Sequence, residues 1–261
     1  MFYGIRQGAT HVITIRNIHT SFGGKTVYKD LNLKIKSDRF LAIIGRSGCG
    51  KSVLLKYILG LMMPDKGEVW VDGLCVNKAS EKDLNQMRRH CGMVFQTAAL
   101  FDSLTVAENV AFAFRQDTSL TPSQKRSMAR EKLKWVGLEQ SMDQFPAELS
   151  GGMRKRVAIA RAIATNPRVI LYDEPTTGLD PITSDKINRL MRELHERIEG
   201  ISIAVTHDMK SAYAICDEMA MIYNGQVIVH DTIEEVRKQQ DPYVKQFLKG
   251  CSEGPIGVDE V

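Results

Sequence analysis

The sequence predicts an α/β fold: a mostly parallel or mixed sheet covered by helices, with an N-terminal antiparallel β portion and an inserted helical subdomain. Three observations support this class. Short β-rich runs alternate with helix-like segments. The pattern becomes almost wholly helical between about residues 100 and 165. The chain has 261 residues, 43% of them hydrophobic, which is enough for one large core domain with a smaller subdomain.

The expected strands are short apolar or β-branched runs. The turns Asp72-Gly73 and Asn224-Gly225 border three of them, and Asn-Gly is the strongest short hairpin signal. Runs that are apolar throughout indicate strands buried on both faces of a sheet. The predicted strands are Val12–Ile15, Phe40–Ile44, Glu68–Val71, Met93–Phe95, Val169–Tyr172, Ile201–Val205, Met219–Tyr223 and Val227–Val229.

Helical spacing predicts one helix over Ser52–Leu59 and three more in the subdomain, which are Val106–Phe114, Pro122–Val136 and Gly151–Ala164. We therefore expect one α/β domain over residues 11–240, with the helical subdomain inserted at about 100–165. Residues 241–261 are expected to form a tail outside the core.

Two interpretations of the tail are open. Its glycines, its proline and its acidic end predict a frayed end beyond about residue 252. Tyr243 and Phe247, spaced i, i+4, would instead let the tail dock as one helical face.

Composition excludes several classes of protein. The formal net charge is +4, from 35 basic and 31 acidic residues that are scattered along the chain, so no nucleic-acid partner is expected. No stretch reaches the roughly 18 apolar residues that span a bilayer, and Met1 to Thr10 lack the features of a secretion signal. We therefore expect a location in the cytosol, where the five scattered cysteines would be free thiols.

The segment Gly45-Arg46-Ser47-Gly48-Cys49-Gly50-Lys51-Ser52 fits the phosphate-binding pattern G-x-x-x-x-G-K-[ST]. An apolar strand precedes it and a helix follows, so backbone N–H groups and the helix N-terminus can face the phosphates of ATP. Lys51 would neutralise the β- and γ-phosphate oxygens, and the Ser52 hydroxyl would hold Mg²⁺. The alternative is a plain glycine turn, which the strand–loop–helix context disfavours. The pattern predicts a P-loop NTPase core.

A hydrophobic strand ends in Asp173 and Glu174. Asp173 can complete the Mg²⁺ shell at the carboxyl edge of the sheet. Glu174 can act as the general base that takes a proton from the attacking water. Neighbouring strand residues point to opposite faces, so the two acids should have different roles. A solvated strand end before Pro175 is the alternative.

Leu149-Ser150-Gly151-Gly152 opens a helix about twenty residues before this acidic strand. With this motif, residues 11–235 resemble the ATPases of ABC (ATP-binding cassette) transporters. The resemblance implies that Phe22 stacks on adenine, that Gln96 touches Mg²⁺ and the hydrolytic water, and that His207 contacts the γ-phosphate.

The same resemblance implies that Gly178-Leu179-Asp180 forms a loop that crosses to the opposite subunit. Each residue also has a plain interpretation: Phe22 as core, Gln96 as a solvated strand end, His207 as a capping or hydrogen-bonded histidine. The motifs occur once each and in the family's order, which favours the functional interpretation.

A homodimer follows from the resemblance and from helix electrostatics. Ser150 and the N–H groups of Gly151 and Gly152 form a second helix-start anion site. In the family this site closes on ATP held by the partner chain, so two chains enclose two ATP molecules. A dimeric membrane permease is then the expected partner, with the ATPase on the cytoplasmic face of the inner membrane.

Two departures from the family pattern stand out. Met153 replaces the usual glutamine after the signature glycines and is followed by the basic run Arg154-Lys155-Arg156. We expect tuned closure of the dimer and not loss of activity. Cys49 lies inside the phosphate loop, where it supplies only its N–H, and we hypothesise that it makes the ATPase sensitive to thiol reagents.

The segment Ala98-Ala99-Leu100-Phe101-Asp102-Ser103-Leu104 resembles the ATPases that pair with MCE-type lipid carriers in Mla phospholipid transporters. It is expected to line the groove that grips the permease. Met153 and the tail resemble the same group, in which the tail reaches toward the neighbouring ATPase subunit. This resemblance implies phospholipid as cargo, an MCE-type partner and a small regulatory subunit. Two alternatives stay open: the ATPase of a polar-solute importer of the amino-acid type, and a soluble ABC protein without a transport role.

Overall fold

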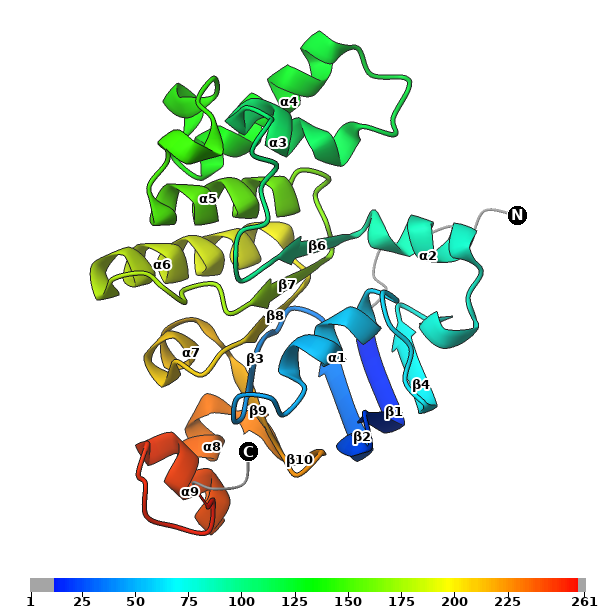
Figure 1. Cartoon of the computed structure of the whole chain (residues 1–261), viewed down its shortest axis with the longest axis vertical. Coiled ribbons are helices and arrows are strands. Elements are labelled where there is room, and N and C mark those ends of the chain that lie inside the picture. Colours follow the sequence, from blue (N-terminus) through cyan, green and yellow to red (C-terminus); the bar gives the residue numbers. More distant parts are fainter. Residues whose placement is uncertain (1–11, 258–261) are drawn as a thin grey trace.

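The computed structural model describes residues 12–257, which fold around two β-sheets (Figure 1). The strands are β1 (Val12–Phe22), β2 (Lys25–Lys36), β3 (Phe40–Ile44), β4 (Lys66–Val71), β5 (Leu74–Cys75), β6 (Cys91–Val94), β7 (Val169–Asp173), β8 (Ile201–Val205), β9 (Glu218–Tyr223) and β10 (Gln226–Thr232). The α-helices are α1 (Lys51–Ile58), α2 (Glu81–Arg88), α3 (Val106–Ala111), α4 (Pro122–Trp135), α5 (Gly151–Ala162), α6 (Pro181–Ile198), α7 (Met209–Ile215), α8 (Ile233–Lys238) and α9 (Pro242–Lys249).

The larger sheet has the strand order β10-β9-β3-β8-β7-β6, in which only β10 runs antiparallel to its neighbour. Every residue of β3 and β8 is buried, as expected for parallel strands covered on both faces. The carboxyl ends of β3, β8, β7 and β6 meet at one edge. The segments that follow these strands, which carry the phosphate loop, Gln96, Glu174 and His207, therefore start from the same edge of the sheet.

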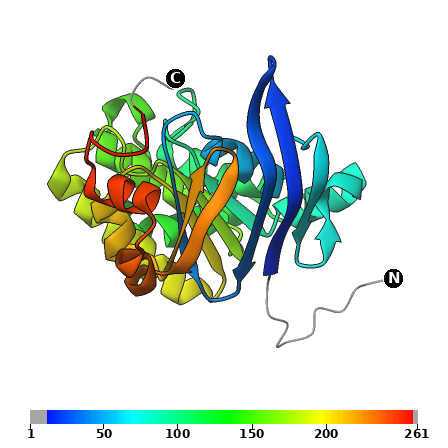
Figure 2. The ribbon, with the colours of Figure 1, turned by 90° about the horizontal axis from the view of Figure 1, so that it is seen from below.

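The smaller sheet, β2-β1-β4-β5, is antiparallel and confirms the predicted N-terminal β portion. Figure 2 shows the two sheets side by side; the turn after β9 lies against β2, where Lys29 N–H donates to the Gly225 carbonyl at 3.0 Å. Helix α1 fills the space between the sheets, because Leu54 and Leu55 belong to one buried cluster with residues of β1 and β3. This cluster fixes the helix that carries the phosphate loop.

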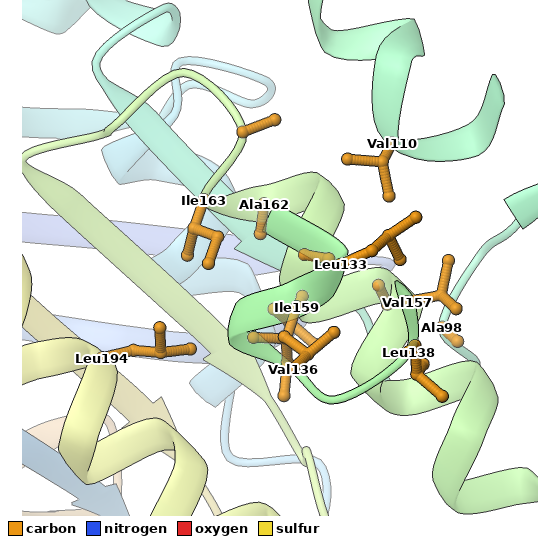
Figure 3. Packing of buried hydrophobic residues seen from close by; sticks show 14 of the residues in the cluster. Ala98, Val110, Leu133, Val136, Leu138, Val157, Ile159, Ala162, Ile163 and Leu194 are labelled. Atoms are coloured by element: carbon orange, nitrogen blue, oxygen red, sulfur yellow. The ribbon is translucent and has the colours of Figure 1, made fainter. Parts of the chain in front are cut away.

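On the opposite face of the larger sheet, α5 and α6 share a second cluster with β7. Figure 3 shows part of this cluster, in which Val157 and Ile159 of α5 lie near Leu133 of α4 and Leu138. The predicted helix over 106–114 begins as α3, but its last three residues form a 3₁₀ turn. Two strands, β2 and β5, and four helices, α2, α6, α7 and α8, were not predicted from the sequence.

The tail differs from its prediction. Residues 242–257 do not lie outside the core, because Val244 and Ile256 are buried against Ile44 of β3. The predicted helical face is confirmed: Tyr243 and Phe247 of α9 pack on this cluster, and the rings of Tyr223 and Tyr243 are 4.7 Å apart. Beyond residue 252, Ile256 is buried and its backbone bonds to the Gln246 amide, while the rest of the predicted frayed end, residues 258–261, lies outside the described part of the chain.

None of the helices formed by residues 12–257 combines the length and the apolar character needed to cross a membrane.

Candidate functional site

The phosphate loop is shaped by two glycines at which no side chain fits. A Cβ on Gly45 would lie 2.5 Å from the Ile222 carbonyl oxygen. Gly50 has φ 100°, and a Cβ there would lie 2.7 Å from the Tyr28 hydroxyl, which donates to the Gly50 carbonyl at 2.6 Å. Strands β2 and β9 thus press the loop into the curve that precedes α1.

The cation of the loop is Lys51, the first residue of α1. It is buried, and its Nζ donates to the carbonyls of Gly45 at 2.8 Å and Arg46 at 2.9 Å. The ammonium group therefore lies over the loop that would cradle a triphosphate. Burial raises the pKa of the neighbouring Cys49 thiol, and the charge of Lys51 opposes that shift.

Two oxygen ligands meet between α1 and β7. The Ser52 hydroxyl donates to Asp173 Oδ1 at 2.7 Å, which joins the end of the phosphate loop to the acidic strand end. A hydroxyl and a carboxylate are hard oxygen ligands that suit Mg²⁺, which takes its other ligands from water and phosphates. Over the described residues no group of three or more His, Cys, Asp or Glu side chains could hold a metal by itself. The donor set thus fits an Mg²⁺ that arrives with a nucleotide.

Glu174 follows Asp173 in a left-handed backbone conformation, with φ 47°. Its N–H donates to the Val205 carbonyl of β8 at 3.0 Å. Its carboxylate accepts from the Thr177 hydroxyl at 3.1 Å and lies 2.9 Å from His207 Nδ1. A carboxylate oriented in this way can accept a proton from a water, and His207 is mostly exposed beside it.

Gln96 follows β6, the strand next to β7, and joins this group through its backbone. Its carbonyl accepts from Lys155 Nζ at 2.6 Å, and the same ammonium is 3.4 Å from the Glu174 carbonyl oxygen. Phe22 ends β1 and is 44% exposed, so its interpretation as a core residue is wrong and its ring is available to a ligand.

The remaining predicted residues gather at the N-termini of α5 and α6. The hydroxyl of Ser150 caps α5 by accepting from Met153 N–H at 3.3 Å. The carboxylate of Asp180 caps α6, and the Thr183 hydroxyl that bonds to it holds the pKa of Asp180 below its usual value. Gly152 lies against Thr183, since a Cβ on Gly152 would be 2.5 Å from Thr183 Cγ2. The structure therefore divides the predicted site into two groups. The phosphate-loop group consists of residues 45–52 with Gln96, Asp173, Glu174 and His207. The signature group consists of residues 150–152 with Asp180.

Two residues that contact these groups, Tyr28 and Lys155, were not identified from the sequence. Tyr28 lies on the unpredicted strand β2, where the alternation of Leu31, Leu33 and Ile35 with polar residues was the available signal for the strand. Lys155 is 5% exposed and stands four residues before Ile159 and seven before Ala162, on the buried face of α5. A charge on the apolar face of a helix is the signal that could have identified it.

Comparisons with known proteins agree with this geometry. The family described as ABC transporter matches residues 28–177. The chain is 41% identical, over 94% of its length and 93% of the relative, to the intermembrane phospholipid transport system ATP-binding protein MlaF of Haemophilus influenzae. It is 36% identical over 95% of its length, and 72% of the relative, to the probable ribonucleotide transport ATP-binding protein mkl of Mycobacterium leprae.

Among solved structures, a dimeric ATP-binding cassette in a post-hydrolysis state bound to ADP and Pi superposes with a TM-score of 0.77 at 35% identity. That match covers 85% of this chain and 98% of the other.

Proposed function

Since the chain belongs to the ABC transporter family and is an ATPase subunit of such a transporter, we propose that it powers a membrane permease that moves phospholipid. The proposal that the cargo is phospholipid rests on the similarity to MlaF, which extends over nearly the full length of both chains. It therefore includes the phosphate loop, the signature and the segment after Gln96.

The proposed chemistry assigns one task to each residue of the phosphate-loop group. Lys51 and the loop N–H groups would bind the β- and γ-phosphates, and Ser52, Asp173 and Gln96 would hold Mg²⁺. When bound, Mg²⁺ neutralises the charge that develops on the phosphate oxygens.

The base step belongs to Glu174, which takes a proton from the attacking water while His207 contacts the γ-phosphate. The 2.9 Å contact between these two side chains supports a shared position at the γ end of the nucleotide. Phe22 would stack on the adenine.

The signature group supplies the other wall of a site formed by two chains. In this proposal Ser150, Gly151 and Gly152 close on ATP held by the phosphate loop of a second copy, with Asp180 at the same interface. The dimeric relative bound to ADP and Pi supports such an assembly. Hydrolysis removes the ligand that joins the two copies, and reopening drives the permease.

The segment after Gln96 is proposed to bind the permease on the cytoplasmic side of the inner membrane. Its Phe101 is 43% exposed and leans on Phe112, with ring centroids 4.4 Å apart. Asn109 is fully buried beneath the segment; its amide donates to the carbonyls of Phe101, Leu104 and Thr105, and its oxygen accepts from Phe101 N–H. An exposed aromatic ring on a firmly held loop suits a protein contact.

A second candidate is an importer of polar solutes. The similarity to a protein named for ribonucleotide transport favours it, although the chain matches only 72% of that relative's length. The two candidates share the ATPase and differ in the permease, in the MCE-type lipid-binding protein and in the small regulatory subunit that lipid transport would add.

The test is to purify the full chain with its membrane companions in mild detergent and identify the proteins and lipids that accompany it. We expect a permease, an MCE-type protein and bound phospholipid. Phe101→Ala should release the permease, whereas Phe145→Ala, equally exposed at 43%, should retain it. A polar-solute permease without phospholipid would show that the cargo is a polar solute and not a phospholipid. The absence of any membrane companion would overturn the proposal.

A further inference from the structure

Helix α5 carries two cations that bind backbone carbonyls of the catalytic loops. Lys155 is 5% exposed, and its Nζ lies 2.6 Å from the Gln96 carbonyl oxygen and 3.4 Å from that of Glu174. Arg161 donates from Nη1 to the Ala99 carbonyl at 2.6 Å and from Nη2 to the Ala98 carbonyl at 2.9 Å. One helix thus binds the segment that follows β6 and the segment that follows β7.

Both segments contain residues with positive φ, a backbone conformation that residues other than glycine rarely adopt. Glu174 has φ 47°, and Ala98 and Ala99 have φ 65° and 47°. Such residues persist only where the surroundings hold them. The carbonyl oxygens of all three accept from Lys155 or Arg161, and Ala98 is buried in the same cluster as Val157 of α5 (Figure 3). The cations of α5 are therefore part of what keeps these loops in place.

Stability alone does not account for the charge of Lys155. Burial lowers the pKa of its ammonium group, and the carboxylates of Asp173 and Glu174 oppose that shift. A buried charge is often no more stabilising than an apolar side chain of similar size. A lysine on the buried face of α5 is therefore better explained by the two carbonyls that it holds.

We propose that Lys155 is a positioning residue for ATP hydrolysis. By binding the backbone carbonyls of Glu174 and Gln96, it would hold the Glu174 carboxylate and the Gln96 amide so that both face the same water. The proposal rests on the roles assigned above to Glu174 and Gln96. Because α5 begins at the signature motif, movement of its N-terminus against the partner's nucleotide would reach both residues through Lys155. The helix thus links closure of the dimer to activation of the water.

The test compares two buried lysines in the full chain. Lys155→Met removes the ammonium and keeps an unbranched side chain. Lys132→Met is the matched control: Lys132 is 4% exposed, but its Nζ bonds to Asn166 Oδ1 at 2.8 Å and lies over the Trp135 ring, in the helical region. Displacements of about 1 Å can reduce rates about 100-fold. We expect Lys155→Met to lower kcat about 10- to 100-fold with the KM for ATP within about two-fold, and Lys132→Met to leave kcat unchanged.

Three further measurements separate positioning from folding. The Tm of each variant shows whether it is folded, and Lys155→Gln replaces Lys155→Met if methionine prevents folding, with the same loss of kcat expected. Lys155→Arg, which keeps the charge and the donors, should recover part of kcat. Equal kcat values for the Lys155 and Lys132 variants would overturn the proposal. Glu174→Gln is measured beside them. If Glu174→Gln is inactive while the Lys155 and Lys132 variants have equal kcat, only the positioning role of Lys155 is wrong. If Glu174→Gln turns over normally, the assignment of Glu174 as the base is wrong, and the Lys155 proposal that rests on it is wrong as well.

Discussion

The phosphate loop and the signature motif both lead into a helix N-terminus, yet their surroundings differ. The loop before α1 is enclosed by Tyr28 and the Ile222 carbonyl, and it carries a cation in Lys51 and an oxygen ligand in Ser52. The start of α5 has an exposed serine that caps its own helix, and its nearby cation, Arg154, donates to the Leu149 carbonyl at 2.6 Å.

That difference tells which region can bind ATP unaided. A cation, a metal ligand and loop N–H groups together can hold a triphosphate. A helix start that lacks a metal ligand and a preceding loop of inward-facing N–H groups can add to an anion that is held elsewhere. The phosphate-loop group should therefore control chemistry within one chain, and the signature group should control closure between two chains.

The largest effect is expected in the phosphate-loop group. Glu174→Gln keeps the shape of the side chain and removes the carboxylate that we propose as the base, and a general base typically contributes about 10²- to 10⁴-fold to the rate. We expect turnover to fall by that factor while ATP still binds, so that ATP-bound dimers accumulate. Single-turnover hydrolysis and size-exclusion chromatography with ATP measure the two effects. Normal hydrolysis by this variant would remove Glu174 from the mechanism.

The signature group should give a smaller and different effect. In Gly152→Ala the new methyl would lie 2.5 Å from Thr183 Cγ2, and overpacking of this kind typically costs about 1–3 kcal/mol. We expect ATP-dependent dimerisation to weaken about ten-fold or more, with ATP binding to one chain unchanged. Analytical ultracentrifugation in the Glu174→Gln background measures the dimer.

The neighbouring glycine supplies the control. A Cβ on Gly151 would meet Leu179 Cδ2 at 3.4 Å, an ordinary contact, so Gly151→Ala should weaken the dimer less. Thr183→Ser removes the methyl at Cγ2 and keeps the hydroxyl that bonds to Asp180 at 2.5 Å, so it should restore dimerisation to Gly152→Ala. If Gly152→Ala dimerises normally, or if Gly151→Ala is equally impaired, the contact with Thr183 does not set the geometry of the signature.

These two groups also mark what could be predicted from the sequence. The phosphate loop, the acidic strand end and the signature are local patterns, and contiguous residues supply most of their chemistry. The second sheet was harder. Strand β2 alternates buried Leu31, Leu33 and Ile35 with polar residues, a period-two signal that the charged composition of the segment obscured.

Long-range contacts could not be predicted from local patterns. From the sequence, the basic run after the signature is typical of a solvated helix face. In the fold, Lys155 lies between Gln96 and Glu174, which are 59 and 19 residues away from it in the chain. The tail gives the same lesson, because the amide of Gln246 bonds to the Ile256 backbone in both directions and fixes residues that composition marks as a loose end. Such partners depend on which strands become neighbours.

The smallest effect concerns Cys49, where the phosphate loop itself opposes the thiol chemistry that the sequence suggests. Only the thiolate reacts with maleimide, and burial raises the pKa of Cys49. A raised pKa means less thiolate at pH 7 than in a free cysteine, and the thiolate fraction of Cys49 rises with pH until the raised pKa is passed. We therefore expect slow inactivation at pH 7 that quickens at least until pH 9, with Cys49→Ser resistant throughout. Peptide mapping should find exposed Cys251 modified first, without loss of turnover. Rapid inactivation at pH 7 that Cys49→Ser abolishes would mean that the phosphate loop opens in solution and exposes the thiol. The enclosure that distinguishes the phosphate loop from the signature motif would then be a property of one conformation only.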